Sequence, residues 1–337
     1  MKAWVWAALT AACAPCASCR AEDAQAPPVS LAPERPGGPA LDDSEPIGPL
    51  PQFAPGSGAL VALGAELFDS PLLSEDGQVA CATCHLSRHG YADDVPRSQA
   101  PARPAMATNT PSLLNVAGLD VLNWNGRFSS LEEQLDALIV NPSVQATSWP
   151  AIASRLGASA ELRARFDAVF PDGVNAANAR AALLAFERSL ASPGAPFDRW
   201  LAGEAGALSE PARRGYEVFK SYGCVSCHQG ALVGGNLFAR LGVMRPYPGG
   251  NTGDPSSDRG RVELTGLELD RHVYRVPSLR NVALTAPYLH DGSLPALPMV
   301  VGVMASYQLG RSLADDQIDD VVAFLASLTG TSPGAAP

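Results

Sequence analysis

The stretches Cys81-Ala-Thr-Cys84-His85 and Cys224-Val-Ser-Cys227-His228 decide how this sequence is understood. Both have the form C-x-x-C-H, in which two thiols are followed directly by an imidazole. This is the attachment sequence for haem c, which is bound covalently through both cysteines. The histidine of the same turn ligates the iron, so His85 and His228 are the expected fifth ligands. The sequence therefore predicts two covalently bound haem groups.

The composition limits the class of protein. The 337 residues are 46% apolar and 17% charged, which fits two modest globular domains and excludes a disordered or fibrous chain. Acidic side chains outnumber lysine and arginine by 34 to 24, so no nucleic-acid-binding surface is expected. No run of eighteen apolar residues occurs, which argues against a membrane-spanning helix. The net charge of −10 favours a docking partner with a basic contact face.

The first part of the chain has the composition of an export signal followed by a linker. Residues 1–21 begin with a lysine and an apolar run, which predicts a secretory signal peptide. Two forms of processing remain open: cleavage near Ala21, or a lipoprotein signal in which a lipid anchor is attached to Cys13. Residues 22–58 contain nine prolines and predict an extended, disordered linker. Because haem c is attached after export, these features agree with a periplasmic protein.

The two halves of the remaining chain share one plan. Gly64 and Phe68, like Gly215 and Phe219, form the pattern Gly-x-x-x-Phe ahead of a haem motif, and each half ends in an amphipathic segment. Small cytochromes c are built from a first helix, the haem motif and a last helix that crosses the first. Since strand alternation is scarce, we expect an all-α fold of two cytochrome c-like domains with long connecting loops.

Domain bounds follow from the composition between the periodic segments. We expect an N-terminal haem domain at 59–203, a C-terminal haem domain at 204–330 and a tail at 331–337. In the second domain Ser209 predicts the start of a helix, and the pattern Ser312-x-x-Asp315 predicts a capping box for the last helix.

Longer motifs resemble those of the bacterial di-haem cytochrome c peroxidases, a family that includes the maturation enzyme MauG. The resemblance covers about residues 59–330 and rests on four segments besides the haem motifs. They are Asn109-Thr-Pro-Ser-Leu-Leu-Asn115, Trp124-Asn-Gly-Arg127, Leu131-Glu-Glu-Gln134 and Pro277-Ser-Leu-Arg-Asn-Val-Ala-Leu-Thr-Ala-Pro-Tyr-Leu-His-Asp-Gly292. In that family the C-terminal haem accepts electrons and the N-terminal haem meets peroxide. The resemblance thus implies a peroxidatic first domain and an electron-transferring second domain.

The resemblance also implies the sixth ligand of the second haem. The family pattern places it fourteen residues after the histidine of the Pro-Tyr-x-His segment, which gives Met304 when counted from His290. Met299 is the alternative, and from the residues alone Met304 is most simply a core side chain. A haem held by methionine and histidine has a raised potential and no open site, so it transfers electrons. His290 is then expected near the haem edge.

Three further roles come from the resemblance alone. Trp124 matches a tryptophan that relays electrons between the haems, and Gln134 keeps its place in the distal pocket. A calcium ion is implied between the domains, with the Asn109 side chain and the backbone carbonyls of Thr285 and Pro287 as ligands. Calcium prefers oxygen donors of this kind.

The distal side of the first haem departs from the family pattern. The histidine that closes this haem in members activated by reduction is replaced by Pro101. We therefore expect a haem that is open, water-bound or closed by Met106. The glutamate of the family sequence Asn-Pro-x-Glu-Met is replaced by Val144, which moves no proton, and the following Gln145 is no general base.

These patterns favour a periplasmic peroxidase that reduces hydrogen peroxide with electrons from a small cytochrome c or a cupredoxin. Two alternatives remain. The first is a MauG-like oxidase of aromatic side chains in a partner protein; Met304 argues against it, because MauG-like members use tyrosine there. The second is a non-catalytic di-haem electron carrier or sensor, for which Val144 argues. The sequence leaves open which donor is used and whether the chain is a monomer or a homodimer.

Overall fold

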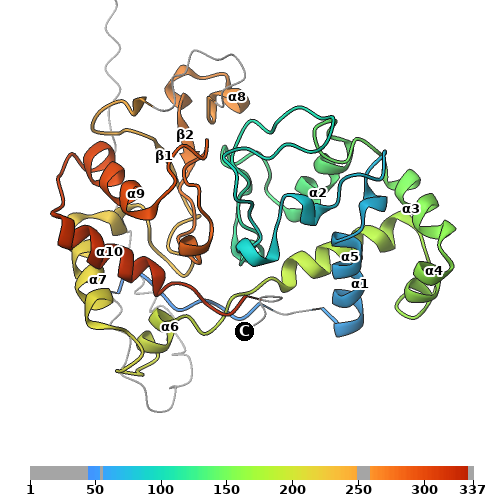
Figure 1. The fold of residues 1–337 in the computed structure, drawn as a ribbon, viewed down its shortest axis with the longest axis horizontal. Coiled ribbons are helices and arrows are strands. Elements are labelled where there is room, and N and C mark those ends of the chain that lie inside the picture. The colour runs from blue at the N-terminus through green and yellow to red at the C-terminus, as the bar shows by residue number, and fades with distance from the viewer. Residues whose placement is uncertain (1–44, 54–55, 249–258, 333–337) are drawn as a thin grey trace, which may run out of the picture. The chain divides into compact units, whose positions relative to one another are not determined.

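The computed structural model describes residues 45–53, 56–248 and 259–332. The expected signal peptide, its cysteine at position 13 and most of the expected linker and tail lie outside these residues. Within the described ranges helices predominate, and the strands form one short two-stranded sheet (Figure 1). The helix-rich part of the expected fold class is therefore confirmed.

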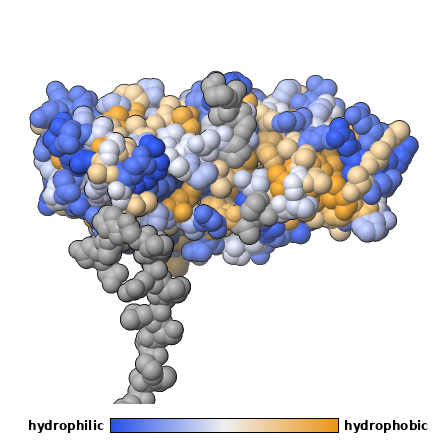
Figure 2. Space-filling model, turned by 90° about the horizontal axis from the view of Figure 1, so that it is seen from below, coloured by the Kyte–Doolittle hydropathy of each residue, from blue (hydrophilic) through white to orange (hydrophobic). Residues whose placement is uncertain are grey.

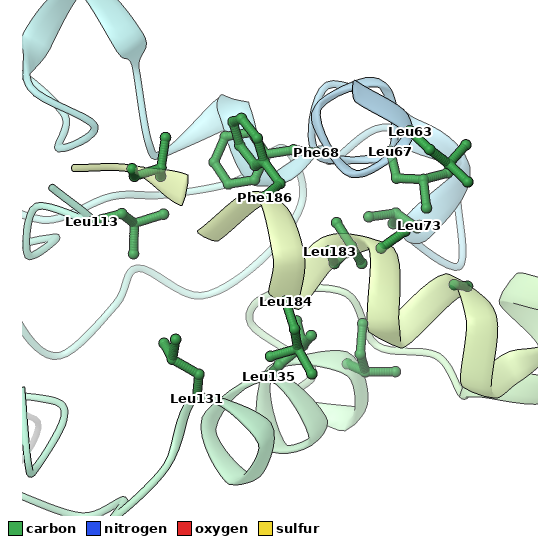
Figure 3. Close-up of a cluster of buried hydrophobic side chains, with 14 of the residues drawn as sticks. Leu63, Leu67, Phe68, Leu73, Leu113, Leu131, Leu135, Leu183, Leu184 and Phe186 are labelled. Atoms are coloured by element: carbon green, nitrogen blue, oxygen red, sulfur yellow. The ribbon is translucent and has the colours of Figure 1, made fainter. Parts of the chain in front are cut away.

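The helices of the first half surround one apolar core. They are α1 (Gly58–Phe68), α2 (Leu131–Val140), α3 (Trp149–Ala158), α4 (Ala160–Asp167) and α5 (Ala176–Ser189). Buried residues recur three or four positions apart, as Leu63 and Leu67 do on α1. Figure 3 shows these leucines beside Leu183 of α5, with Leu135 of α2 in the same cluster.

The second half has its own core around a pair of longer helices. Its elements are α6 (Pro196–Leu201), α7 (Glu210–Tyr222), β1 (Phe238–Arg240), α8 (Val262–Thr265), β2 (Val273–Arg275), α9 (Leu297–Val303) and α10 (Asp315–Ala326). The strands are antiparallel, with Phe238 opposite Arg275. Ser209 caps α7 as predicted, because its hydroxyl accepts a hydrogen bond from the Ala212 N–H.

The predicted capping box at the last helix is wrong. Helix α10 begins after Ala314, and the amide oxygen of Gln317 accepts a hydrogen bond from the Ala314 N–H at 3.1 Å. Asp315 and Asp316 occupy the first turn, where acidic side chains are favoured by the helix dipole. The carboxylates thus lie inside the helix, and Ser312 precedes it.

Two glycines permit the first and last helices of each half to cross closely. A Cβ added at Gly64 would lie 2.0 Å from the carbonyl oxygen of Ala182 on α5, and one at Gly215 would lie 1.8 Å from that of Asp320 on α10. Such distances are far below van der Waals contact, so only glycine fits. The pattern Gly-x-x-x-Phe therefore recurs because both crossings need a residue without a side chain.

Two segments that precede the expected second domain, 204–330, pack in the core of the second half. Helix α6 packs in the second core, where Phe197 is fully buried and its ring lies 4.9 Å from that of Tyr216. This helix precedes the expected domain boundary between residues 203 and 204. Part of the expected linker is also ordered, since Ile47 is fully buried in the same core and Glu45 accepts a hydrogen bond from the Tyr216 hydroxyl.

A buried polar network joins the two halves. Asn115 and Asn281 both donate a side-chain hydrogen bond to the Ser192 hydroxyl, at 2.8 and 2.7 Å. Both asparagines have left-handed backbone conformations and precede similar short turns. They belong to the repeated sequence Pro-Ser-Leu-x-Asn-Val, at 111–116 and 277–282, which extends the internal repeat beyond the haem motifs.

In the part of the chain that the structure describes, no helix is both long and apolar enough to cross a bilayer. On the face drawn in Figure 2, hydrophobic residues lie in patches among hydrophilic ones.

We expect Gly64→Ala and Gly215→Ala each to lower the free energy of unfolding by about 1–3 kcal/mol, because the new methyl group meets a helix backbone. The matched control is Gly157→Ala in α3, where the nearest atom to an added Cβ lies 4.0 Å away. Helix propensity should make this control neutral or more stable by up to about 1 kcal/mol. Denaturant unfolding compares the three variants, and equal stabilities would contradict the packing argument.

Two candidate haem cavities

The first haem motif opens into a cavity with about 1150 Å³ of empty space. Cys81, Cys84 and His85 line it on one side. The expected distal residues line it as well, namely Met106, Gln134, Val144 and Gln145. The structure thus brings the motif together with residues that follow it by twenty to sixty positions.

The second haem motif opens into a cavity with about 1540 Å³ of empty space. Its lining includes all the residues that the sequence assigned to the second haem, which are Cys224, Cys227, His228, His290 and Met304. Met304 begins a π-helical turn, Met304–Gln308, directly after α9. Such turns are frequent at functional sites because they redirect side chains. Met299, the alternative ligand, is 49% exposed and does not line the cavity.

Both histidines are held in the form that binds iron. His85 Nδ1 donates to the Tyr91 carbonyl at 2.8 Å, and His228 Nδ1 donates to the Val233 carbonyl at 3.3 Å. These bonds leave Nε2 as the free nitrogen and fix the ring orientation. Burial lowers the pKa of His85 and lowers that of His228 to about 4, so both rings are neutral at pH 7. A neutral imidazole is the ligand that a metal requires.

The four motif cysteines are free thiols on the cavity walls. Burial raises the pKa of Cys81 and raises that of Cys224 to about 11, so these thiols stay protonated at pH 7. An aromatic ring lies beside each histidine: the Phe68 and His85 ring centroids are 6.4 Å apart, and those of Phe219 and His228 are 6.3 Å apart. In both halves the residues present fit a thioether-linked haem.

The distal side of the first cavity is polar but contains no carboxylate at position 144. Gln134 donates through Nε2 to the Asn123 side chain at 2.5 Å. Gln145 is 2% exposed, and its Oε1 has no hydrogen-bond partner among the described residues. The Val144 carbonyl accepts a hydrogen bond from the buried Arg103, which fixes this turn.

A buried carboxyl of the first cavity was missed by the sequence analysis. Glu187 lies on α5, is 8% exposed and lines the cavity. Burial raises its pKa to about 8, so the side chain is protonated at pH 7. The sequence contained one indication of this residue. Glu187 follows Phe186 on the buried face of α5, the last helix of the first half, where a glutamate interrupts the apolar pattern.

The two cavities share a wall. Trp124 lines both, and so does the segment Asn109–Pro111. The Trp124 indole N–H donates to the Asn109 carbonyl at 2.9 Å, which holds the ring in this wall. The tryptophan therefore lies in the wall between the two cavities.

Reciprocal hydrogen bonds hold this wall in place. The loops Leu122–Phe128 and Tyr288–Leu294 are each closed by an antiparallel bridge, and Trp124 and His290 are their third residues. The Asn109 N–H donates to the His290 carbonyl, and the Arg275 N–H donates to the Trp124 carbonyl, both at 2.7 Å. Each half thus binds the third residue of the other half's loop.

The three residues expected to bind calcium, which are Asn109, Thr285 and Pro287, all line the second cavity. The Asn109 amide nitrogen donates to the carbonyls of Val95 and Pro96, at 3.2 and 3.3 Å, which leaves Oδ1 as the acceptor atom. No group of three or more histidine, cysteine or carboxylate side chains suited to a metal occurs in the described ranges. Calcium here would depend on amide and carbonyl oxygens.

Comparison with known proteins agrees with this geometry. A family model described as di-haem cytochrome c peroxidase matches residues 58–206. Cytochrome c551 peroxidase of Nitrosomonas europaea is 37% identical, over 86% of each chain. Cytochrome c peroxidase Ccp of Escherichia coli is also 37% identical over 85% of this chain, which spans 62% of that protein's length.

A solved structure shows the same architecture. The crystal structure of a MauG-like protein associated with microbial copper homeostasis aligns with a TM-score of 0.71 and 27% identity, over 86% of this chain and 95% of the other. Two C-x-x-C-H cavities, a shared tryptophan wall and extended sequence identity lead to one conclusion. This chain belongs to the di-haem cytochrome c peroxidase family of oxidoreductases.

Proposed function

We propose that this protein reduces hydrogen peroxide to water at the first haem, with electrons that enter through the second. The observation that carries the proposal is the wall of Trp124 and Asn109–Pro111, which lines both cavities. When bound, the first haem supplies an iron that binds peroxide, and the second supplies a site that stores and passes electrons. Each peroxide consumes two electrons and two protons.

The protein's own residues divide the remaining tasks. Gln134 and Gln145 present amide groups to the first cavity, where they orient peroxide or water by hydrogen bonds. Trp124 is the relay, held at its indole nitrogen and at its carbonyl. Met304 is the proposed sixth ligand of the second haem, and Asn109, Thr285 and Pro287 are the proposed calcium ligands.

The proposed setting follows from the sequence and the family. We place the protein in the periplasm, since haem c attachment and the leader sequence both favour export, with a lipid tether through Cys13 as one form. A small cytochrome c or a cupredoxin is the proposed electron donor. The acidic net charge favours a donor with a basic contact face.

A second function is favoured by one specific observation. Val144 occupies the position of the family's acid/base glutamate. The amide groups of Gln134 and Gln145, which line the same cavity, do not act as general bases. A di-haem electron carrier or sensor would need no such group. The two functions differ in whether peroxide is consumed.

Steady-state consumption of hydrogen peroxide with a reduced small cytochrome c tests the proposal. We expect measurable turnover in the wild type and a gain in Val144→Glu of some part of the roughly 10²–10⁴-fold that acid–base groups contribute. The backbone should stay in place, because Arg103 binds the carbonyl of this residue. Val144→Gln is the matched control, since it adds the same shape without an acid.

The outcomes separate the two functions. The protein is a carrier if the wild type holds two haems and accepts electrons, but neither the wild type nor Val144→Glu consumes peroxide. Equal gains in Val144→Glu and Val144→Gln would show that polarity rather than proton transfer limits the reaction.

If Met304 ligates the second haem, Met304→Leu should abolish its low-spin methionine–histidine spectrum and lower its reduction potential, because a methionine ligand raises the potential of a haem. Met299→Leu is the matched control: this methionine is exposed and outside the cavity, so both properties should stay unchanged. Optical spectra and a potentiometric titration measure both. The assignment of Met304 fails if only the control variant alters the spectrum.

Glu187→Gln should remove a pH-dependent loss of stability. The ordinary pKa of this carboxyl is 4.5 and its pKa in the fold is about 8, so the folded state binds more protons and wild-type stability falls as the pH rises between these values. The side chain of the variant stays neutral. Its free energy of unfolding, minus that of the wild type, should therefore rise by about 2 kcal/mol between about pH 6 and pH 8. Denaturant unfolding at both pH values measures this. The exposed Glu161→Gln should show no such trend, and the same flat result in Glu187→Gln would contradict the burial argument.

A further inference from the structure

Two buried arginines line the second cavity, and only one of them lies beside a carboxylate of the described residues. Arg275 and Arg280 are each 5% exposed. A guanidinium stays charged in proteins, and a buried charge is costly unless an opposite charge or several hydrogen bonds compensate it. Where each arginine finds its counter-charge is therefore informative.

Arg280 has its counter-charge within the chain. Its Nη1 lies 2.8 Å from a carboxylate oxygen of Asp198, which is itself largely buried. Its other nitrogens donate to the carbonyls of Ala231 and Gly48, at 2.9 and 3.0 Å. Its charge is therefore balanced within the chain by the Asp198 carboxylate, although Nη1 makes this contact as an ion pair and not as a well-aligned hydrogen bond.

Arg275 has no carboxylate partner among the described residues. Its Nε donates to the Asn123 carbonyl at 3.3 Å, and its buried Nη1 has no hydrogen-bond partner in the described ranges. Burial alone lowers its pKa to about 10, so the group remains charged at pH 7. Apart from the haem-motif residues, the titratable side chains that line this cavity are Tyr274, Arg280, Tyr288 and His290, and none is an acid that could balance it.

The position of Arg275 is fixed by its backbone. It ends strand β2, pairs with Phe238 of β1, and donates its N–H to the Trp124 carbonyl at 2.7 Å. The strand pairing therefore holds Arg275 at the wall of the second cavity, where an anion bound in that cavity would meet its guanidinium.

We propose that Arg275 is the ion-pair partner of a propionate of the second haem. This inference rests on the haem content of the proposed function and adds a residue to it. A haem carries two propionate carboxylates, and the planar guanidinium suits a carboxylate, which it binds with two parallel hydrogen bonds. Arg275 is a positioning residue: it compensates the propionate, and its charge keeps the second haem easy to reduce.

The proposal has a measurable consequence for the reduction potential. A positive charge near the haem disfavours the oxidised iron, so its removal lowers the potential. Without Arg275 the buried propionate also binds a proton more readily, and the potential then falls as the pH rises and that proton is lost. In the wild type the potential should be nearly flat from about pH 6 to 9, because His290, with a pKa lowered to about 4, is neutral throughout.

Spectroelectrochemical titration of the loaded protein tests this, after mass spectrometry shows two haems in each variant. In Arg275→Gln, the ratio of reduced to oxidised second haem at a fixed potential above pH 7 should fall at least tenfold, about 59 mV for one electron. The potential should also become pH-dependent, and Arg275→Lys should restore most of both properties. Arg240→Gln is the matched control, since it removes an equal charge from the exposed end of β1.

Several outcomes would overturn the proposal. One is an Arg275→Gln protein that holds both haems and titrates like the wild type and the control. If Arg275→Gln does not fold, the propionate bending mode in resonance Raman spectra of the wild type and Arg275→Lys decides: it should differ between them, and identical modes reject the ion pair. A protein that carries both haems but consumes no peroxide would overturn the proposed function while leaving this measurement intact.

Discussion

The close crossing of the first and last helices in each half is the constraint on which the rest of the structure depends. Gly64 and Gly215 let one helix backbone touch the other, and the phenylalanine one turn later then lies beside the haem-motif histidine. The crossing fixes where the haem turn leaves the first helix and where its cavity opens. A larger residue at either glycine would separate the helices and widen the wall behind the iron ligand.

The two halves are joined by a reciprocal arrangement rather than by one large apolar face. Asn115 and Asn281 meet at the hydroxyl of Ser192, and the Asn109 and Arg275 backbones each bind the loop of the other half. These bonds are buried or nearly so, where hydrogen bonds are most costly to lose. They hold Trp124 in the wall between the cavities, so the same contacts that join the halves also fix the residue that we propose as the electron relay.

Burial gives both cavities a common electrostatic character. Removal from water keeps the histidines neutral and suited to bind iron, and it keeps Glu187 protonated. The same low dielectric makes the uncompensated charge of Arg275 costly, which is why its partner matters. The first cavity thus combines neutral groups at the site that we propose for peroxide, while the second contains the charge of Arg275, for which we propose a haem propionate as partner.

The sequence by itself predicted the haem attachment residues and determined the helix-rich class, because the C-x-x-C-H motif and helix periodicity depend on residues close together in the chain. It also showed that Gly64 and Gly215 occupy equivalent positions in a repeat, but not that both allow a close helix crossing. Only the tertiary structure assigned α6 and Ile47 to the second core, exposed Met299, and placed Glu187 and Arg275 in the cavities. These features arise from contacts between residues far apart in the chain, and local patterns carry no information about which distant surface covers a side chain.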